Sequence, residues 1–150
     1  MKLKLNLSGT SDRSVKSLIK KACEAVLKTE CFKENAEVSV LITDSVEVQK
    51  LNKEFRGKDK TTDVLSFPMN EINPENGYLI LGDIIINAEL VKKQAEDFGH
   101  GEQRELAFLT IHSMLHLLGY EHENDKSGEK IMREKQDKIL TALGLGIKDD

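Results

Sequence analysis

The chain has 150 residues, of which 39% are hydrophobic and 32% are charged, and its formal net charge is −4. This length and composition predict one globular domain with a single substantial core, spanning residues 1–150. They exclude a membrane protein, because no apolar run approaches the roughly 20 residues that a membrane-spanning helix needs. The acidic balance also argues against a broad, non-specific nucleic-acid binder, although it leaves room for a local basic surface.

The N-terminal residues and the cysteines predict the cellular compartment of the protein. The N-terminal residues alternate between apolar and polar and lack the apolar block of a signal peptide. Cys23 and Cys31 are too few for a disulfide framework, so we expect both to be reduced and partly buried. These features predict a cytoplasmic protein.

The first third of the chain alternates between strand and helix patterns. Leu3, Leu5 and Leu7 alternate with polar residues, which predicts a half-buried strand. A helix is expected from Asp12 to about Glu30, with Ser11 as its N-cap, because its apolar residues have helical spacing. Residues 36–43 are rich in β-branched side chains and predict a second strand.

The middle of the chain predicts a helix and two strands. Asp44 followed by Glu47 forms a capping-box pattern that opens a helix ending near Phe55. Residues 64–67 predict a short strand that Pro68 either ends or marks as an edge. Residues 69–77 are expected to be a loop, and residues 78–86 form a nearly continuous apolar run that predicts a buried strand.

Three helices are expected in the last part of the chain. Asn87 caps the first, and the last is amphipathic, begins at Asp125 or Ser127 and ends at Gly144. Between them, residues 102–118 are apolar nearly all round, which is typical of a helix at the centre of its domain. The order βαβαββααα predicts an α+β fold in which a mixed sheet of about four strands packs against helices.

Three of the four histidines fall within eleven residues at the end of this central helix. His112 and His116 are four residues apart, so they project from the same face of a helix and can bind one metal ion. Gly119 can end the helix in the left-handed conformation and bring His122 back toward the other two. The spacing therefore predicts a three-histidine metal site.

The ligand set indicates the chemistry. Three neutral imidazoles normally leave a fourth position for water, whose pKa a bound zinc ion lowers to about 7. No cysteine is placed to complete a structural site, which favours an open, catalytic centre holding one Zn²⁺. Ser113 stands where a metalloprotease has its glutamate base, and Glu121 is a candidate base by proximity or else an exposed turn residue or a supporting partner of a histidine.

Arg56 is the candidate residue for contact with substrate. A guanidinium matches the oxygens of a phosphate and can stabilise the charge that develops there. For a single arginine before a polar loop, a surface ion pair with Asp59 or Asp63 is the competing interpretation.

The segment from His112 to His122 closely resembles the His-Gly-x-Leu-His-Leu-x-Gly-Tyr-Asp-His signature of the YbeY family, bacterial zinc-dependent endoribonucleases also called rRNA maturation factors. Three further blocks resemble this family in the same order. They are Leu51 to Arg56 with Asp59 and residues 62–68, then Leu81-Gly82-Asp83-Ile84, then Arg104-Glu105-Leu106-Ala107.

The resemblance implies a zincin-like fold and an enzyme that hydrolyses single-stranded RNA. It implies action on ribosomal RNA, notably at the 3′ end of the small-subunit RNA, and in ribosome quality control. The implied partners are the small ribosomal subunit and its assembly factors, with no DNA and no membrane. His112, His116 and His122 would bind the zinc, and Arg56 and His112 would be the catalytic residues.

Two positions depart from the signature, and two other functions remain open. Ser113 replaces the family's usual glycine, where its hydroxyl can hydrogen-bond within the site, and Glu121 replaces the usual aspartate.

A zincin-type metallopeptidase is the first alternative, weakened by Ser113. The second is a non-catalytic ribosome-assembly factor in which zinc is structural.

Overall fold

Four strands form one mixed sheet in the computed structural model, which describes residues 1–120 and 126–146. The strands are β1 (Leu3–Ser8), β2 (Ala36–Thr43), β3 (Val64–Ile72) and β4 (Leu79–Asn87). Their order across the sheet is β1-β2-β4-β3. β1, β2 and β4 run parallel, and β3 pairs antiparallel with β4. β4, which has the longest apolar run among the strands, is therefore an inner strand of the sheet, as predicted. Pro68 lies on β3, an edge strand, which was one of its two predicted positions.

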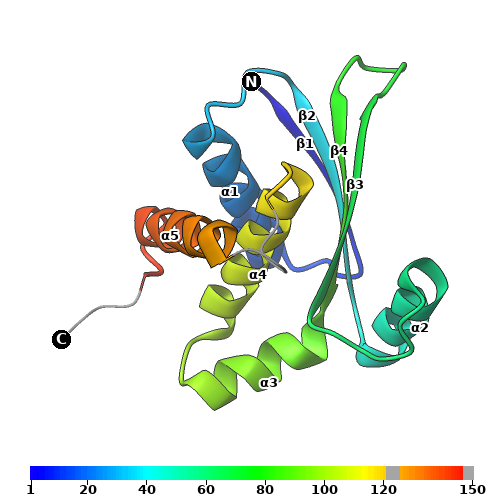
Figure 1. The fold of residues 1–150 in the computed structure, drawn as a ribbon, viewed down its shortest axis with the longest axis vertical. Coiled ribbons are helices and arrows are strands. Elements are labelled where there is room, and N and C mark those ends of the chain that lie inside the picture. Colours follow the sequence, from blue (N-terminus) through cyan, green and yellow to red (C-terminus); the bar gives the residue numbers. More distant parts are fainter. Residues whose placement is uncertain (121–125, 147–150) are drawn as a thin grey trace.

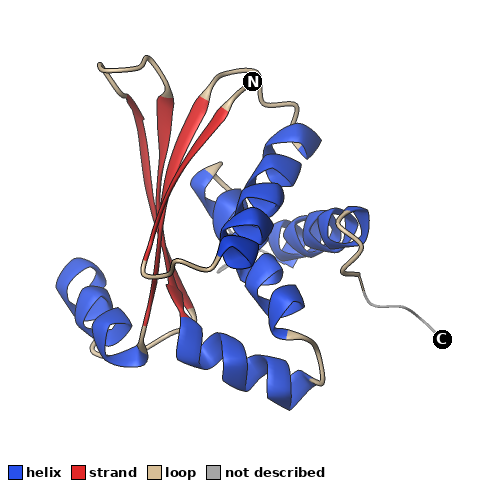
Figure 2. Cartoon of the chain, turned by 180° about the vertical axis from the view of Figure 1, so that it is seen from behind, coloured by secondary structure: helices blue, strands red, loops and turns tan. Residues whose placement is uncertain are grey.

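In the part of the chain that the structure describes, five helices pack on both faces of this sheet. They are α1 (Arg13–Thr29), α2 (Ser45–Arg56), α3 (Ala88–Phe98), α4 (Glu102–Leu117) and α5 (Lys126–Ala142). The order along the chain is βαβαββααα, so the predicted α+β class is confirmed. Two opposite views show α1, α4 and α5 on one side of the sheet and α2 on the other (Figures 1 and 2).

Two of the three predicted helix caps are confirmed, and one is wrong by a residue. Asp44 accepts a hydrogen bond from the amide of Glu47, and Asn87 caps α3. At α1 the cap is Asp12 and not Ser11, because the Asp12 carboxylate accepts hydrogen bonds from both the amide and the hydroxyl of Ser14. These bonds also lower the pKa of Asp12, since they stabilise its ionised form.

β3 is longer than its sequence pattern predicts. Residues 69–72 were expected to lie in a loop, but the strand continues to Ile72. The strand register shifts between Pro68 and Glu71, and Asn70 takes a left-handed backbone with φ 55°. This bulge lets the ladder resume after the proline, and a local pattern of alternating residues does not reveal such an insertion.

A buried carboxylate fixes the far end of the β3–β4 hairpin. Glu37 on β2 accepts hydrogen bonds from the amide nitrogens of Asn6, Asn73 and Asn76. These donors, led by Asn76, lower the pKa of Glu37 despite the opposing effect of burial. The hairpin is thereby tied to β2 and, through Glu37, to β1.

α4 is the central helix of the main core, as its composition predicts. Ten of its 16 residues are buried, and it packs against α1, α3, α5 and the sheet. A smaller core lies under α2, where Val48, Leu65 and Ile85 are buried together. The histidines therefore sit on the element that most of the fold surrounds.

The two cysteines differ. Cys23 is fully buried in α1, and burial raises the pKa of its thiol to about 12. Cys31 is exposed, so the expectation that both would be partly buried is wrong for it. No helix in the described ranges is long and apolar enough to cross a membrane.

Candidate metal centre

The C-terminal half of α4 brings two histidines together. His112 and His116 lie one turn apart on the same face, and their Nε2 atoms are 3.0 Å apart. The rings meet nearly edge to face, at an interplanar angle of 78°. The helical spacing thus directs both nitrogens to one point.

The other nitrogen of each ring faces a buried or half-buried partner. Nδ1 of His116 lies 2.8 Å from the backbone carbonyl oxygen of Tyr120. Nδ1 of His112 lies 2.6 Å from the side-chain amide nitrogen, Nε2, of Gln136 on α5. The Phe108 ring also stacks on His112, with ring centroids 6.1 Å apart. Both imidazoles are therefore oriented by neighbours, which is the usual arrangement around a metal site.

The turn after α4 follows the predicted glycine stop. Gly119 has φ 102°, a conformation that strongly favours glycine. The amide of Gly119 donates to the carbonyl of His116, and the amide of Tyr120 donates to that of Leu115. This reversal places the Tyr120 carbonyl where His116 can reach it.

Tyr120 lies beside an ion pair that joins α5 to the C-cap residue of α1. Lys135 of α5 donates to the carboxylate of Glu30 at 3.0 Å, and its ammonium lies 5.3 Å from the centre of the Tyr120 ring. Hydrogen bonding to Glu30 is the main cause that raises the pKa of the Tyr120 hydroxyl. The start of the returning segment is thus held against α5.

A glycine in β4 lets the histidine helix approach the edge of the sheet. Gly82 has φ 151°, and a Cβ there would lie 2.9 Å from Cδ2 of Leu117 and against the backbone oxygen of Phe67. Leu117 is the last residue of α4, so this contact seats the end of the histidine helix beside β3. Close packing of α4 and β3 against β4 therefore explains why a glycine stands at position 82.

His122, the third predicted ligand, and Glu121, the candidate base, lie outside the described residues. Within residues 1–120 and 126–146, no group of three potential ligand side chains converges. The donor set of His112 and His116 nevertheless suits zinc, because both ring edges face one point and both second nitrogens have partners. The residues present fit the predicted metal.

Arg56, the candidate residue for contact with substrate, is on another helix. It is the exposed last residue of α2, and α2 lies on the face of the sheet opposite α4 (Figure 1). Asp59 contacts Lys53 at 3.8 Å, and within the described ranges Arg56 forms no ion pair. α2 and α4 both pack against β3, so the helix that carries Arg56 and the helix that carries the histidines contact the same edge strand.

Sequence reasoning missed Gln136, and its expectation for Ser113 remains a prediction. Gln136 is a polar residue in the apolar stripe of α5, between Met132 and Leu140, and this interruption was the available signal. Ser113 is fully buried, and among the described residues its hydroxyl has no hydrogen-bond partner. The expectation that its hydroxyl can bond within the site finds no support there.

A buried carboxyl lies on the same helix. Glu105 is only 5% exposed, and desolvation is the main cause that raises its pKa, with a further contribution from Asp63. Glu105 precedes His112 by two helical turns, so the two project in similar directions. Asp63 directly precedes β3. Its effect on Glu105 therefore shows that the first half of α4 lies near the start of β3.

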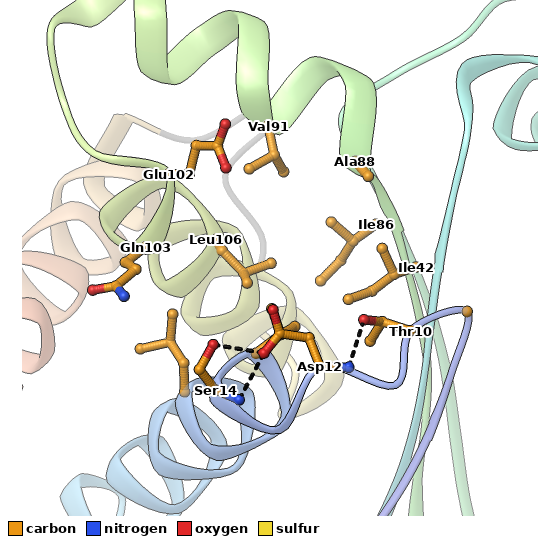
Figure 3. Close-up of a pocket in the computed structure, with 13 residues that line it drawn as sticks. Thr10, Asp12, Ser14, Ile42, Ile86, Ala88, Val91, Glu102, Gln103 and Leu106 are labelled. Atoms are coloured by element: carbon orange, nitrogen blue, oxygen red, sulfur yellow. Dashed lines mark hydrogen bonds between the residues drawn. The ribbon is translucent and has the colours of Figure 1, made fainter.

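A partly enclosed cavity lies elsewhere in the molecule. A cavity of about 450 Å³ lies at the carboxyl ends of the parallel strands, between the first turns of α1, α3 and α4 (Figure 3). Its floor includes Ile42, Ile86 and Leu106, and its rim includes Asp12 and Glu102. None of the histidines of α4 lines it.

Comparison with known proteins identifies relatives over nearly the whole chain. The model of a family described as Endoribonuclease YbeY matches residues 4–144. A protein named Endoribonuclease YbeY from Caldanaerobacter subterraneus is 46% identical over 142 residues, covering 87% of this chain and 89% of the relative. One of the same name from Pelotomaculum thermopropionicum is 43% identical, covering 93% and 95%.

A solved structure shares the fold. The solution structure of TM1509 from Thermotoga maritima superposes with a TM-score of 0.65 at 31% sequence identity. The match covers 95% of this chain and 89% of that chain. The fold is therefore shared along nearly the whole chain.

Proposed function

The chain belongs to the YbeY endoribonuclease family, and we propose on this basis that it is a zinc-dependent endoribonuclease, one domain over residues 1–150, that cleaves single-stranded RNA. The observation that carries the proposal is the convergence of His112 and His116, 3.0 Å apart at Nε2, on the central helix. Its biological substrate would be ribosomal RNA, at the 3′ end of the small-subunit RNA. Ribosome quality control, the small subunit and its assembly factors belong to the same proposal, as does a cytoplasmic location.

His112, His116 and His122 would hold one Zn²⁺, with no further cofactor. When bound, zinc supplies positive charge that polarises a phosphoryl oxygen and activates water for attack. The chain's own residues orient the ligands: Tyr120 and Gln136 face the second nitrogens, and Phe108 stacks on His112. Arg56 would neutralise phosphate charge on RNA passing around the β3 edge.

The proposal is tested with purified protein and a fluorescent single-stranded RNA. His112→Ala should lower cleavage by more than about 100-fold, exceeding the loss expected when a mere supporting residue of a metal site is removed. His100→Ala is the matched control, because His100 stacks on Phe98 between α3 and α4 and should leave cleavage unchanged. Retained cleavage by His112→Ala protein, with contaminating nucleases excluded, would overturn the proposal.

The cellular part is tested by mapping the 3′ ends of small-subunit rRNA. Strains carrying His112→Ala or Arg56→Ala should accumulate unprocessed 3′ ends, whereas His100→Ala should not. Normal ends in both strains, together with unfolding of the protein on metal removal, would favour a structural zinc. Cleavage of casein by the zinc-loaded protein would instead point to a peptidase, for which buried Ser113 offers no base.

A further inference from the structure

The charged residues are unevenly distributed along the chain. Residues 1–33 contain eight basic and three acidic side chains, whereas the rest of the chain contains 14 basic and 23 acidic side chains. The eight basic residues are all exposed, and they are Lys2, Lys4, Arg13, Lys16, Lys20, Lys21, Lys28 and Lys33. None of them forms an ion pair with another residue in the described ranges. An acidic protein thus carries a local basic surface on and around β1 and α1.

A hollow of about 640 Å³ gathers three of these lysines. Lys2 and Lys4 border it on the β1 side, and Lys20 borders it on the α1 side. The half-buried Tyr78, just before β4, also lines it. The N-terminus and the β3–β4 hairpin lie at this end of the sheet (Figure 1). Cationic groups beside an aromatic ring suit a single-stranded nucleic acid, because its phosphates pair with the charges and a base stacks on the ring.

A second hollow, of about 350 Å³, adjoins the first, and Glu24 lines both. Lys28 and Lys33 border the second hollow, together with the half-buried Phe32. Lys28 follows Lys20 by about two turns of α1, or about 12 Å along the helix axis. The positive charge therefore continues along the helix from one hollow to the next.

The C-terminal end of α1 leads from these hollows toward the histidines. Lys28 is two residues before Glu30, the C-cap of α1, whose carboxylate accepts a hydrogen bond from Lys135 at 3.0 Å. The Lys135 ammonium lies 5.3 Å from the centre of the Tyr120 ring, and the Tyr120 carbonyl oxygen lies 2.8 Å from Nδ1 of His116. The basic surface therefore ends beside the segment that supports the metal centre.

We propose that the two hollows form an RNA-binding surface that holds the phosphate backbone of a single-stranded substrate outside the metal centre. Lysines of both hollows contact phosphates, and one base stacks on Tyr78. This inference rests on the proposed endoribonuclease function, because RNA is the anion that such an enzyme must hold. An acidic protein partner would match the lysines but would not need the aromatic ring.

The proposal is tested by measuring RNA binding without cleavage. The full-length protein in EDTA is titrated against a fluorescent, unstructured single-stranded RNA at several salt concentrations. Lys20→Gln combined with Lys28→Gln should weaken binding about 10-fold at about 0.1 M salt. The slope of the logarithm of the binding constant against the logarithm of salt concentration should fall by about 1.4, since each phosphate contact contributes about 0.7. Lys92→Gln combined with Lys93→Gln on α3 removes two exposed lysines elsewhere and should change neither quantity.

Two single substitutions test the remaining parts of the surface. Tyr78→Leu removes the ring and keeps an apolar side chain, so it should weaken binding about 5-fold or more without changing the salt slope. Glu24→Gln removes the carboxylate that lines both hollows and should tighten binding about 2- to 5-fold, because a like charge no longer repels the phosphates. Circular dichroism checks that each variant is folded, and the lysine pair decides the point if Tyr78→Leu does not fold.

Three results would overturn the inference. They are an unchanged affinity and salt slope in the folded Lys20→Gln, Lys28→Gln protein, an equal loss in the Lys92→Gln, Lys93→Gln protein, and tighter binding of poly-glutamate than of RNA of the same length. The last result would assign the surface to an acidic protein partner. Failure of the proposed function looks different, because the zinc-loaded wild-type protein would not cleave RNA while RNA binding still depended on Lys20 and Lys28.

Discussion

The two ends of α4 use polar side chains differently. At its start, Asp12 and Thr10 surround a cavity of about 450 Å³, but their hydrogen bonds close a local turn (Figure 3). Thr10 accepts from the amide of Asp12, and Asp12 caps α1. At its other end, about 20 Å away along the helix axis, side chains from α4 and α5 and one backbone carbonyl converge on two imidazoles.

The difference shows that cavity volume does not locate chemistry. The start of α4 is called the cavity end here. The cavity there is lined by apolar side chains, and its polar side chains bond to the backbone amides at the start of their own helix. The histidine end has ring nitrogens whose partners come from distant parts of the sequence and orient them toward one point. Substitutions at the cavity end should therefore change stability alone, and those at the histidine end should also change metal binding.

The largest effect is expected from Gly82→Ala at the histidine end. The new methyl group would meet Leu117 and the Phe67 backbone while the residue keeps a left-handed φ, so stability should fall by roughly 3–6 kcal/mol. Because Leu117 ends the histidine helix, the folded fraction should also bind zinc more weakly. Denaturant unfolding and chelator competition measure the two effects.

Leu106→Ala is its counterpart at the cavity end. Leu106 is 9% exposed, and its truncation should cost about 2–3 kcal/mol, at the low end for a leucine because the site already borders a cavity. Zinc affinity should stay at the wild-type value. Equal losses of zinc affinity in the two variants would break the distinction between the two ends.

Asn87→Ala, beside the cavity, should lower the free energy of unfolding by about 2–4 kcal/mol. The Asn87 amide nitrogen donates to Ser45, Thr61 and the carbonyl of Thr62, and its oxygen caps α3. Its removal leaves buried groups unpaired, which thermal unfolding should report as a lower midpoint. Zinc affinity per folded molecule should not change, and a large decrease would show that the cavity end communicates with the histidines.

The sequence predicted local features well because local rules decide them. Helical spacing alone placed His112 and His116 together, and Asp44 and Asn87 are caps because their short polar side chains reach the next backbone amides. The apolar composition of α4 likewise predicted its central place. Each of these depends on residues within a few positions of one another.

Features that depend on distant contacts were not predictable in this way. The strand order, the bulge after Pro68 and the pairing of Gln136 with His112 join segments far apart in the chain. The helix of Arg56 is a further example, since the sequence could not place α2 on the face of the sheet opposite α4 (Figure 1). The role of Arg56 stays a prediction.

A smaller, pH-dependent effect is expected from Glu105→Gln. Burial raises the pKa of Glu105 above its ordinary 4.5, so folding favours the protonated acid and stability falls as pH rises from 4.5 through the raised pKa. The glutamine variant should be more stable than wild type at about pH 7 and lose this advantage at about pH 4. Unfolding curves across this range provide the measurement, and an advantage that grows toward low pH would contradict it.

The smallest effect is expected from Ser113→Ala, next to a ligand. The buried Ser113 hydroxyl has no hydrogen-bond partner among the described residues, so its removal should raise stability by up to about 1 kcal/mol. Thr110→Val is the contrast, because the Thr110 hydroxyl donates to the carbonyl of Leu106 at 2.8 Å and its loss should cost about 1 kcal/mol. If Ser113→Ala instead weakened zinc binding, the hydroxyl would belong to the metal centre, and the histidine end would extend to the buried side of α4.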